Sequence, residues 1–562
     1  MTSKPRRENA LFDRLKRARL LRAVVLTLAL PLAACAGDGE EKASFGEVGY
    51  IEGFFGGLSV DEPNAALVGR DVLTAGGTAA DAAVAMGFAL SVTYPSGITL
   101  GGGGSCVVHD ATLGVTEALD FIARPGSGPA GDRPTAVPAM TRGMVALHAR
   151  YGRLDWRRLV APAEQLARLG HRASRAFATE LAPAAGALFA DPDLREIFLR
   201  PDGRPVGEGD RFTQLDLGGL LARIRTQGGG VLYTGAFADR LVEAYRAAGG
   251  SLTREDLRSF IPEWRSTLLI PFGTGELHVA PPPAQAGPVM AQSFALLAAD
   301  DRYADASDGE RPHLLAEVSK RALADRRRWL GADLFAAPDA ASLIAEARLA
   351  RLFAGYSPID ASVQAPDGPP RDLVEAPAGA GFVVVDREGM AVACELTNYY
   401  PFGTGRVVEG TGIIPAAAPT GRGRNPLSLG PAVAVDATSL AFEFAVASVG
   451  GAFAQATSTQ LSADVLLRGL GPREAIALPR VLGVDAPNLT VLESNAPDGS
   501  QEAAMAEALR ISGHEVQRTD WPARANLVHC PFGLPNPNRG SFCAVANDPR
   551  GFGLAVTAAD ES

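Results

Sequence analysis

The sequence predicts a mixed fold of α-helices and β-strands, on the evidence of a buried hairpin, a helix pair and one long amphipathic helix. The apolar runs 382–385 and 391–396 flank a charged, glycine-containing turn, which is typical of a β-hairpin with two largely buried strands. Punctuating glycines and small apolar residues predict helices from about 63 to 75 and from about 79 to 92. Residues 313–330 place apolar side chains on or near one helix face.

Length and composition favour a globular protein with a full core. The chain has 562 residues, of which 47% are apolar, enough for two or more domains. The formal charge is −10, and no Lys/Arg run outside the N-terminus suggests a nucleic-acid surface. No Cys or His spacing is typical of a metal site, and no cofactor is implied. We therefore expect neither nucleic-acid binding nor a metal centre.

The N-terminus has the pattern of an export signal, which we place at residues 1–34. A basic segment precedes the short apolar run 23–32, which is too short to span a membrane as a stable helix. The run ends in Leu-Ala-Ala-Cys35, which resembles a bacterial lipobox and implies that Cys35 is lipidated. Residues 35–57 are then the lipidated Cys and a tether. We expect a periplasmic protein attached to the inner or outer membrane by its lipid alone; the alternative is an ordinary secreted protein.

Four further cysteines follow Cys35. An even number permits disulfides in an oxidising compartment, and Cys530 and Cys543 flank a Pro/Gly/Asn-rich loop that a disulfide could close. Cys394 lies in the middle of a predicted strand, where we expect a small buried hydrophobic residue.

Two helix starts and one histidine carry further expectations. Asp61 can cap the helix that begins near Pro63, and Thr253 can cap a helix that follows it. His313 stands at the start of the long amphipathic helix, so we interpret it as a helix-start residue and not as a catalyst.

Several long motifs together resemble the γ-glutamyltransferases, also called γ-glutamyltranspeptidases or glutathione hydrolases. They are the helix pair AALVGRDVLTAGGTAADAAVAMGFALSVTYP, the run of four glycines at 101–104, and the hairpin that follows residue 376. The resemblance is collinear over roughly residues 58 to 560. It implies the four-layer αββα sandwich of N-terminal-nucleophile hydrolases, built as one joint domain from a heavy-subunit-like region, 58–378, and a light-subunit-like region, 379–562.

The nucleophile of that family is missing. Its pattern Thr-Thr-His-Tyr/Phe-Ser-Val-Val-Asp matches residues 379–386, GAGFVVVD, so Gly379 stands where the nucleophilic Thr is expected. Self-cleavage and acyl transfer need a hydroxyl or thiol. Between Ser362 and Cys394 there is no Ser, Thr or Cys, so no shift of the alignment restores one.

The residues that hold the γ-glutamyl group are also altered. Ile122 replaces the Arg that binds the α-carboxylate; Arg124 could take that role if the loop is rearranged, and is otherwise a surface residue. Asn398 matches a substrate-contacting Asn, with one extra residue before Phe402. The segment 415–419 has only Pro and Ala where the family has the polar residues that hold the α-amino group, so γ-glutamyl specificity should suffer.

Two later motifs are partly kept. Ser428 retains one of two adjacent serines of the family pattern. Gly450 and Gly451 match the turn whose N–H groups form the oxyanion hole, although two glycines equally suit the start of an ordinary helix.

Three hypotheses follow. The first is an uncleaved, catalytically silent periplasmic lipoprotein that binds a small peptide-like or γ-glutamyl ligand, or a protein partner, in the old cleft. The second is an active γ-glutamyltransferase/glutathione hydrolase or related amidohydrolase with a displaced nucleophile, for which Thr397, Thr404 and Ser428 are nearest; an internal hydroxyl would need a separate base. The third is a purely structural envelope protein. The oligomeric state stays open.

Overall fold

The computed structural model describes residues 55–129, 131–330, 334–362, 378–419, 429–485, 488–535 and 542–557. The expected signal segment, Cys35 and Ser428 lie outside the described residues, as do most of the tether and of the loop before Gly379. The described residues belong to one compact unit, Ile51–Ser562. No helix in these ranges is both long and apolar enough to cross a bilayer.

The first sheet has seven antiparallel strands in the order β18-β1-β9-β10-β2-β3-β6. The predicted hairpin lies at its centre as β9 and β10, with strand ends close to those expected. The strands are β1 Gly56–Val60, β2 Gly103–Asp110, β3 Val115–Phe121, β6 Glu263–Ser266, β9 Ala380–Asp386, β10 Ala391–Thr397 and β18 Leu554–Thr557.

The second sheet has six antiparallel strands in the order β17-β16-β12-β11-β8-β7. These are β7 Leu268–Phe272, β8 Gly275–Val279, β11 Ala432–Asp436, β12 Phe442–Val449, β16 Arg524–His529 and β17 Ala544–Asn547. Two small sheets lie outside the sandwich. They consist of β4 His171–Arg172 with β5 Arg211–Phe212, and of β13 Val481–Val484, β14 Leu489–Glu493 and β15 Val516–Thr519.

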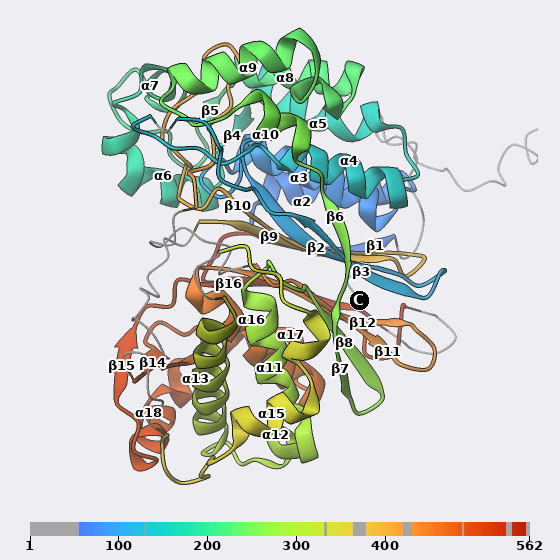
Figure 1. The fold of residues 1–562 in the computed structure, drawn as a ribbon, viewed down its shortest axis with the longest axis vertical. Coiled ribbons are helices and arrows are strands. Elements are labelled where there is room, and N and C mark those ends of the chain that lie inside the picture. Colours follow the sequence, from blue (N-terminus) through green and yellow to red (C-terminus); the bar gives the residue numbers. More distant parts are fainter. Residues whose placement is uncertain are drawn as a thin grey trace, which may run out of the picture. The chain divides into compact units, whose positions relative to one another are not determined.

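Helices cover the outer face of each sheet, so the architecture is the expected αββα sandwich (Figure 1). Helices α2, α3 and α4 pack on the first sheet, and further helices lie above them. The helices on this side are α2 Pro63–Thr74, α3 Ala79–Thr93, α4 Met140–Tyr151, α5 Trp156–Leu169, α6 Arg175–Leu188, α7 Pro192–Phe198, α8 Leu215–Gln227, α9 Gly235–Ala247 and α10 Arg254–Ser259. The second sheet is covered by α11 Ala286–Ala298, α12 Arg302–Asp305, α13 Arg311–Leu330, α14 Ala340–Leu343, α15 Glu346–Phe353, α16 Ala452–Ser462, α17 Pro472–Ala477 and α18 Glu502–Ile511.

The cap of α2 differs from the prediction. Glu62, and not Asp61, accepts the hydrogen bond from the first turn, with Oε2 2.9 Å from Ala65 N. Thr93 at the end of α3 donates to the same oxygen at 2.6 Å, which fixes Glu62 in this role. Asp61 instead accepts hydrogen bonds from Gly381 on β9 and Asn526 on β16. The predicted cap at Thr253 is present, as a capping box with Asp256.

Helix α13 is buried on both its apolar and its polar face, although its sequence predicts one exposed face. Every side chain from Pro312 to Arg326 is buried, because α11, α15, α18 and β13 all pack against it. Buried charge is then paired inside the protein. Glu317 forms ion pairs with Lys320 and Arg321, and His313 contacts His514 with 2.8 Å between ring nitrogens.

Cys394 is buried, as predicted, but it is not a free thiol. It forms a disulfide with Cys106, which lies directly opposite on β2. The two cysteines are 288 residues apart in the sequence, so no local pattern predicts that they pair. The register of β10 against β2 brings them together. Cys530 and Cys543 also form a disulfide.

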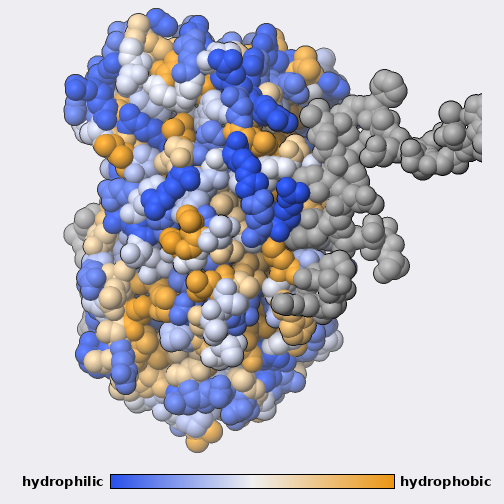
Figure 2. All heavy atoms as spheres, turned by 90° about the vertical axis from the view of Figure 1, so that its right-hand side faces the viewer, coloured by the Kyte–Doolittle hydropathy of each residue, from blue (hydrophilic) through white to orange (hydrophobic). Residues whose placement is uncertain are grey.

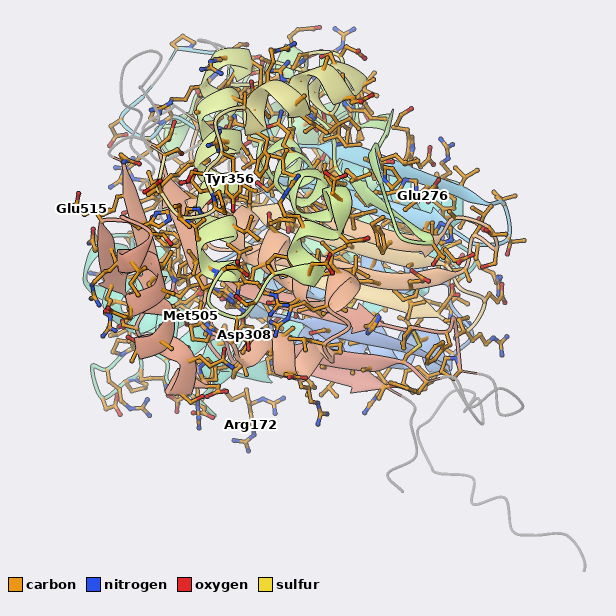
Figure 3. The ribbon with its side chains drawn as sticks, turned by 90° about the horizontal axis from the view of Figure 1, so that it is seen from below. Arg172, Glu276, Asp308, Tyr356, Met505 and Glu515 are labelled. Atoms are coloured by element: carbon orange, nitrogen blue, oxygen red, sulfur yellow. A yellow bond between two sulfur atoms is a disulfide. The ribbon has the colours of Figure 1, made fainter. Side chains whose placement is uncertain are left out.

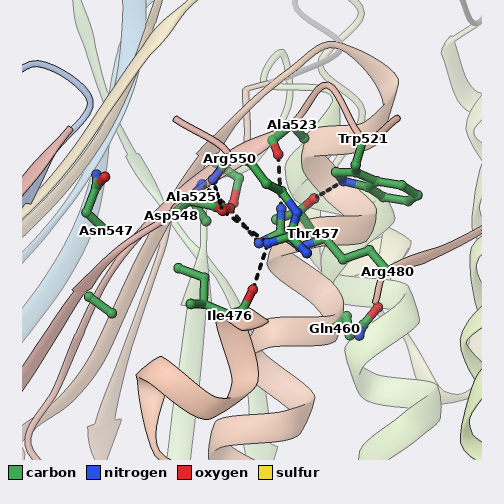
Figure 4. A network of polar contacts seen from close by, with 12 residues as sticks. Thr457, Gln460, Ile476, Arg480, Trp521, Ala523, Ala525, Asn547, Asp548 and Arg550 are labelled. Carbon is green, nitrogen blue, oxygen red and sulfur yellow. Dashed lines mark hydrogen bonds and ion pairs between the residues drawn. The ribbon is translucent and has the colours of Figure 1, made fainter. Parts of the chain in front are cut away.

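A buried ionic network ties the C-terminal strands to the helices beside them (Figure 4). Arg480, which is 1% exposed, donates to Asp548 at 2.5 Å and to the Ala523 carbonyl at 3.0 Å. Arg550 bonds Asp548 and the backbone carbonyl of Ile476. Burial lowers the pKa of Arg480, and Asp548 opposes that shift.

Hydrophobic side chains also reach the surface. Figure 2 shows them gathered in the lower half of one face, the half that contains the second sheet and its helices. Leu269 on the edge strand β7 is 40% exposed.

Candidate functional site

Gly379 lies one residue before β9, buried between the two sheets. A Cβ atom at this position would lie 2.9 Å from the Leu396 carbonyl oxygen and 3.1 Å from Val449 Cγ1. The first contact is with the backbone of β10, which cannot turn aside as a flexible side chain can. A side chain at residue 379 would therefore require the neighbouring strands to move.

Arg524, the first residue of β16, covers the backbone at Gly379. Its Nη2 donates to the Gly379 carbonyl at 3.0 Å and to the Tyr94 hydroxyl at 2.6 Å. Its Nε lies 3.3 Å from Asp61 Oδ2, and its Nη1 lies 3.2 Å from Glu180 Oε1. One guanidinium group thus joins both carboxylates and the Gly379 carbonyl, which belongs to the peptide bond after the expected cleavage position.

The electrostatics of this cluster favour a charged guanidinium. Burial by itself lowers the pKa of Arg524, but interactions with Tyr94, Asp61 and Glu180 outweigh it and raise that pKa. Burial raises the pKa of Asp61, an effect that Arg524 partly offsets. Tyr94 also donates a hydrogen bond to Glu180, and burial holds its own pKa well above the usual value. The tyrosine is therefore a neutral donor.

Asp61 links the cluster to the sheet. Its Oδ2 accepts from Gly381 N at 2.8 Å, and its Oδ1 accepts from Asn526 Nδ2 at 2.7 Å. Asn526 also donates to the Gly381 carbonyl at 3.0 Å. These contacts join the residue after β1 to β9 and β16, and so hold both sheets together at the end of the sandwich where Gly379 lies.

Thr397 is the hydroxyl that the structure places beside the expected cleavage position. Its Oγ1 donates to the Ala378 carbonyl at 3.0 Å and accepts from Tyr399 N at 2.9 Å. Two residues earlier on β10, Glu395 accepts from Ser448 N at 2.6 Å and from Gly430 N at 2.5 Å. Burial raises the pKa of Glu395 to about 8, against the opposing effect of these two N–H donors.

A general base for Thr397 is not among the described histidines. All seven have their recorded hydrogen bonds or ring contacts with residues outside the Gly379 and Thr397 cluster. Three examples are His109 with Leu440, His278 with Thr267 and His313 with His514.

The other predicted site residues are scattered. Asn398 is fully buried, and its side chain accepts from Thr99 N at 3.1 Å and donates to the Pro95 carbonyl at 3.3 Å. Arg124 pairs with Asp120 at 3.2 Å and stacks over Phe335. The described polar contacts of both residues are thus made within the protein.

The segments expected to recognise a γ-glutamyl group are packed as core. Ile122, Ala123 and Ala416 are each at most 1% exposed and share the hydrophobic cluster between the sheets with Tyr399. The Tyr399 hydroxyl donates to the Ala123 carbonyl at 2.6 Å. Apolar side chains therefore surround the positions where polar recognition residues were expected.

Gly450 and Gly451 form the turn between β12 and α16, and Gly451 is the N-cap of that helix. Gly450 has φ +140°, and a Cβ there would lie 2.3 Å from Ala523 Cα. The close approach of the two backbones requires glycine at this position. The turn follows Val449, so the structure does bring the predicted glycines close to Gly379.

A cavity of about 1000 Å³ adjoins the cluster, and we call it the Arg524 cavity. Arg524 and Glu180 form part of its wall, Arg133 and Thr404 another part, and the rest is mainly apolar. Its lining residues are Asp132, Arg133, Pro134, Thr179, Glu180, Pro183, Ala184, Ala187, Leu188, Tyr400, Pro401, Gly403, Thr404, Gly405, Ala417, Pro522 and Arg524.

Sequence reasoning missed the four polar residues that define this site: Asp61, Tyr94, Glu180 and Arg524. Arg524 lies in a segment interpreted only as strands and turns, and each of its partners is at least 145 residues away in the sequence. An arginine at the start of an apolar strand was the available signal. Within the described ranges, no group of three or more His, Cys, Asp or Glu could hold a metal ion.

Comparison with known proteins finds similarity over most of the chain. The family model described as gamma-glutamyltranspeptidase matches residues 65–553. The glutathione hydrolase proenzyme of Pseudomonas aeruginosa is 30% identical over 388 residues, which cover 64% of this chain and 66% of that protein. The alignment thus spans just under two thirds of that relative's length. The glutathione hydrolase of Aspergillus flavus is 27% identical over 526 residues, 86% of each chain.

Among solved structures, the fold is similar to that of a cephalosporin acylase from Bacillus halodurans. The TM-score is 0.76 at 21% sequence identity, and the match covers 92% of this chain and 99% of the other. At that identity the likeness is one of fold.

Proposed function

Because the chain belongs to the gamma-glutamyltranspeptidase family, we propose that it is a catalytically silent member that stays in one piece and binds a small peptide-like ligand in the Arg524 cavity. The observation that carries the proposal is the place of Gly379. It has no hydroxyl, a Cβ there would lie only 2.9 Å from the Leu396 carbonyl oxygen, and Arg524 holds its carbonyl at 3.0 Å.

Loss of the nucleophile removes the first step of any acyl transfer in this family. A self-cleaving enzyme needs a nucleophile at the cleavage position, activated by a base. Here the position is glycine, and the charged group bound to its own carbonyl is Arg524, a permanent cation that cannot act as a base. The packed segments around Ile122 and Ala416 add a second reason, since they leave the family's recognition groups without counterparts.

The remaining cavity suits a ligand with charges of both signs. Glu180 has a side chain 28% exposed, and Arg133 lies exposed in another part of the wall, where its Nη1 donates to the Thr404 carbonyl at 3.2 Å. Most of the lining between them is apolar, the usual composition of a small-molecule site. A short peptide, with an ammonium and a carboxylate joined by an apolar stretch, fits this distribution.

We also propose that the protein is a periplasmic lipoprotein attached through Cys35. The basic and apolar N-terminal segments and the lipobox-like ending support this location. The two disulfides are consistent with it, because disulfides persist in oxidising compartments.

One observation favours an alternative, an active amidohydrolase that uses Thr397. Its hydroxyl lies 3.0 Å from the Ala378 carbonyl oxygen, which belongs to the peptide bond expected to be cleaved. In that contact the hydroxyl is the donor, which directs its proton and not a lone pair at the carbonyl group. Use of Thr397 as nucleophile would require this hydrogen bond to break and a base to approach.

The deciding experiment uses the chain with Cys35→Ser, which prevents lipidation. Intact mass and a denaturing gel report cleavage, both after reduction of the disulfide between Cys106 and Cys394, which joins the two halves of the chain. Release of p-nitroaniline from γ-glutamyl-p-nitroanilide reports turnover. We expect one uncut chain and no turnover. Two fragments that meet near Gly379, or turnover that Thr397→Ala abolishes, would overturn the proposal in favour of the alternative.

Ligand binding is tested separately by filling the cavity. Ala184 lines it from α6, whereas Ala182 is exposed on the same helix and is not part of the lining. With a set of di- and tripeptides as probes, we expect thermal stabilisation of the parent and of Ala182→Phe, and loss of that stabilisation in Ala184→Phe. Equal responses of the two variants would exclude this cavity as the site.

A further inference from the structure

Turns from both large sheets lie side by side at the end of the sandwich where β1 begins. Gly56, the first residue of β1, pairs with Asp386, the last residue of β9, so the turn between β9 and β10 lies beside it. A Cβ atom at Gly389 in that turn would lie 3.0 Å from Ala111 Cβ, in the turn between β2 and β3, and 3.7 Å from Leu534 Cδ1, in the loop after β16. Loops of both sheets thus share this end.

The turn between β11 and β12 belongs to the same group. A Cβ at Gly114 would lie 2.7 Å from Leu440 Cδ1, and a Cβ at Gly533 would lie 3.7 Å from Ala441 Cβ. His109 on β2 also lies against this turn, with its Nε2 2.9 Å from the Leu440 carbonyl oxygen. We call this surface the Gly56 end and define it as residues 56, 111–115, 386–390, 437–441, 531–534 and 542.

Large apolar side chains are exposed at the Gly56 end. They are Leu113, Val115, Phe532 and Phe542, each at least 39% exposed. The disulfide between Cys530 and Cys543 holds the two phenylalanines near the base of one loop. Side chains of this size are usually buried, and several that are exposed together mark a surface that contacts a partner or a membrane.

The acidic groups beside these side chains are bound within the protein. Asp110, Asp386 and Asp436 each precede one of the turns, and each carboxylate accepts hydrogen bonds from N–H groups of its own turn. Glu388 in the turn between β9 and β10 forms an ion pair with Arg153, with 2.8 Å between Oε1 and Nη1. Paired carboxylates lower the cost of bringing the neighbouring apolar side chains into a less polar medium.

The expected lipid anchor joins the fold at the same end. Residues 36–54 connect Cys35 to Phe55, which directly precedes Gly56. A lipid on Cys35 would therefore attach the protein to a bilayer through the end that exposes Leu113 and Phe532. Exposed Phe and Leu side chains bind bilayers by insertion at the boundary between headgroups and acyl chains. The place of the anchor and the chemistry of the surface thus favour one occupant, a lipid bilayer.

We propose that the Gly56 end contacts the bilayer, with Leu113, Phe532 and Phe542 inserted at the boundary between headgroups and acyl chains. The proposal builds on the lipidation of Cys35 proposed above. It goes beyond that proposal because a lipid tether by itself sets no orientation, whereas inserted side chains fix which face of the protein meets the membrane.

This orientation has a consequence for the Arg524 cavity. Strand β9 runs from Ala380, next to Gly379, to Asp386 at the Gly56 end, and a strand of 7 residues is about 20 Å long. Because Arg524 binds the Gly379 carbonyl, the cavity lies at the end of the sandwich that is far from the bilayer. Its ligands would then come from the aqueous compartment and not from the membrane.

The test uses the chain from Cys35 onward, which contains the whole compact unit Ile51–Ser562. Its Cys35 thiol is coupled to a maleimide lipid in phosphatidylcholine vesicles, or to a soluble maleimide for the free form. The other four cysteines are in disulfides, so coupling is confined to Cys35 and does not depend on lipidation in the cell. Neutral lipid is chosen because the formal charge of the chain is −10, which an anionic surface would repel.

Hydrogen–deuterium exchange compares the anchored and free forms. We expect the amides of residues 112–116 and 531–535 to exchange more slowly in the anchored form, and those of residues 403–405, in the wall of the Arg524 cavity, to exchange equally in both. Equal exchange at all three segments, or slowing at 403–405 instead, overturns the proposal.

A matched pair of variants shows whether the apolar side chains cause the slowing. Leu113→Ser/Phe532→Ser alters the Gly56 end, and Leu169→Ser/Ile511→Ser is the control; the exposed fractions are 68% and 74% in the first pair and 68% and 76% in the second. Loss of two inserted side chains should weaken the contact at least about tenfold and so abolish the slowing, which the control should retain. Slowing that survives in the first variant, or is lost equally in both, overturns the proposal.

The control residues lie away from the Gly56 end. Figure 3 shows Glu515, four residues after Ile511, on the opposite side of the molecule from Glu276, which pairs with Val435 near the end of β11. Leu169 is the last residue of α5, a helix that begins shortly after Arg153, the partner of Glu388.

Two further measurements separate this proposal from its neighbours. Sedimentation velocity of the Cys35→Ser chain should show a monomer; a dimer that Leu113→Ser/Phe532→Ser dissociates would assign the surface to a second copy and overturn the proposal. The intact mass of the protein extracted from cell membranes tests the lipidation of Cys35 by itself. Failure of the lipoprotein proposal is therefore distinct from failure of the membrane-contacting surface.

Discussion

Arg524 Nη2 lies 3.0 Å from the carbonyl oxygen of Gly379, so a side chain from the second sheet holds the backbone just before the central strand of the first. The same guanidinium group forms ion pairs with Asp61 and Glu180. The position where we expect the family's nucleophile is thus bound by an ion cluster that also forms part of the wall of the Arg524 cavity. This relationship makes the site sensitive to small changes in predictable ways.

Addition of a single methyl group at residue 379 should destabilise the protein. Because its Cβ would lie 2.9 Å from the Leu396 carbonyl, Gly379→Ala should lower the free energy of unfolding by about 1–3 kcal/mol. Gly219, exposed within α8 with open space around it, is the matched control, and Gly219→Ala should raise stability by about 0.4–1 kcal/mol. Urea unfolding measures both. Equal effects of the two substitutions would show that Gly379 is not enclosed.

Removal of the Arg524 side chain should lower the free energy of unfolding and should make that free energy fall more steeply as pH rises. Arg524→Met leaves Asp61 and Glu180 without their cation, and loss of one partner of a buried pair costs about 3–5 kcal/mol near neutral pH. Burial already raises the pKa of Asp61 above 3.8, and loss of the Arg524 charge raises it further. A raised carboxyl pKa means that stability is highest below the unfolded pKa and falls as pH rises.

Denaturant unfolding of Arg524→Met at several pH values between 4 and 8 tests this, with Arg175→Met as control. Arg175 forms an exposed pair with Glu208, so its loss should change stability little. A variant whose stability rose with pH relative to the parent would contradict the proposed cluster.

Glu395 should make the stability of the unsubstituted protein depend on pH. Its pKa is raised from 4.5 to about 8 by burial, so the folded state holds the proton more tightly than the unfolded state does. Its contribution is therefore fully present below pH 4.5 and is lost as pH rises through about 8. Glu395→Gln cannot ionise, so the difference in melting temperature between parent and variant should shrink or reverse from pH 5 to pH 9. A constant difference over that range would refute the assignment.

The two disulfides should differ in how much they add to the free energy of unfolding. A disulfide lowers the conformational entropy of the unfolded chain, which stabilises the folded state by about 3 kcal/mol for a short loop and about 5 kcal/mol for a very long one. Cys106 and Cys394 are 288 residues apart, and Cys530 and Cys543 are 13 apart. Double substitution to Ala of the first pair should therefore destabilise the protein more in urea unfolding. The reverse order would mean that native packing and not loop length decides the effect.

The sequence predicted the architecture well where the signal is local, as in the hairpin at β9 and β10 and the helix pair α2 and α3. It failed where a choice between neighbours depends on distant partners. Asp61 and Glu62 both precede Pro63, and cap preference favours Asp. The structure uses Glu62 because Thr93 fixes it, while Asp61 accepts from Gly381, 320 residues away.

Cys394 illustrates the same limit. The apolar run around it predicts burial correctly, because burial follows from the pattern of its own strand. Its partner Cys106 depends on the register of β10 against β2, which involves a segment that no local pattern connects to it. The Arg524 cluster, built from β16, α6 and the end of α3, was unpredictable for that reason.

Each of the two large sheets contains strands from both sides of residue 379. The first sheet takes β1, β2, β3 and β6 from before it and β9, β10 and β18 from after it, and the second combines β7 and β8 with β11, β12, β16 and β17. A break in the chain at Gly379 would leave all these strand pairings in place. The two pieces, which the disulfide between Cys106 and Cys394 also joins, would then sediment and elute as one particle. The size of the folded protein therefore does not report whether its chain is intact.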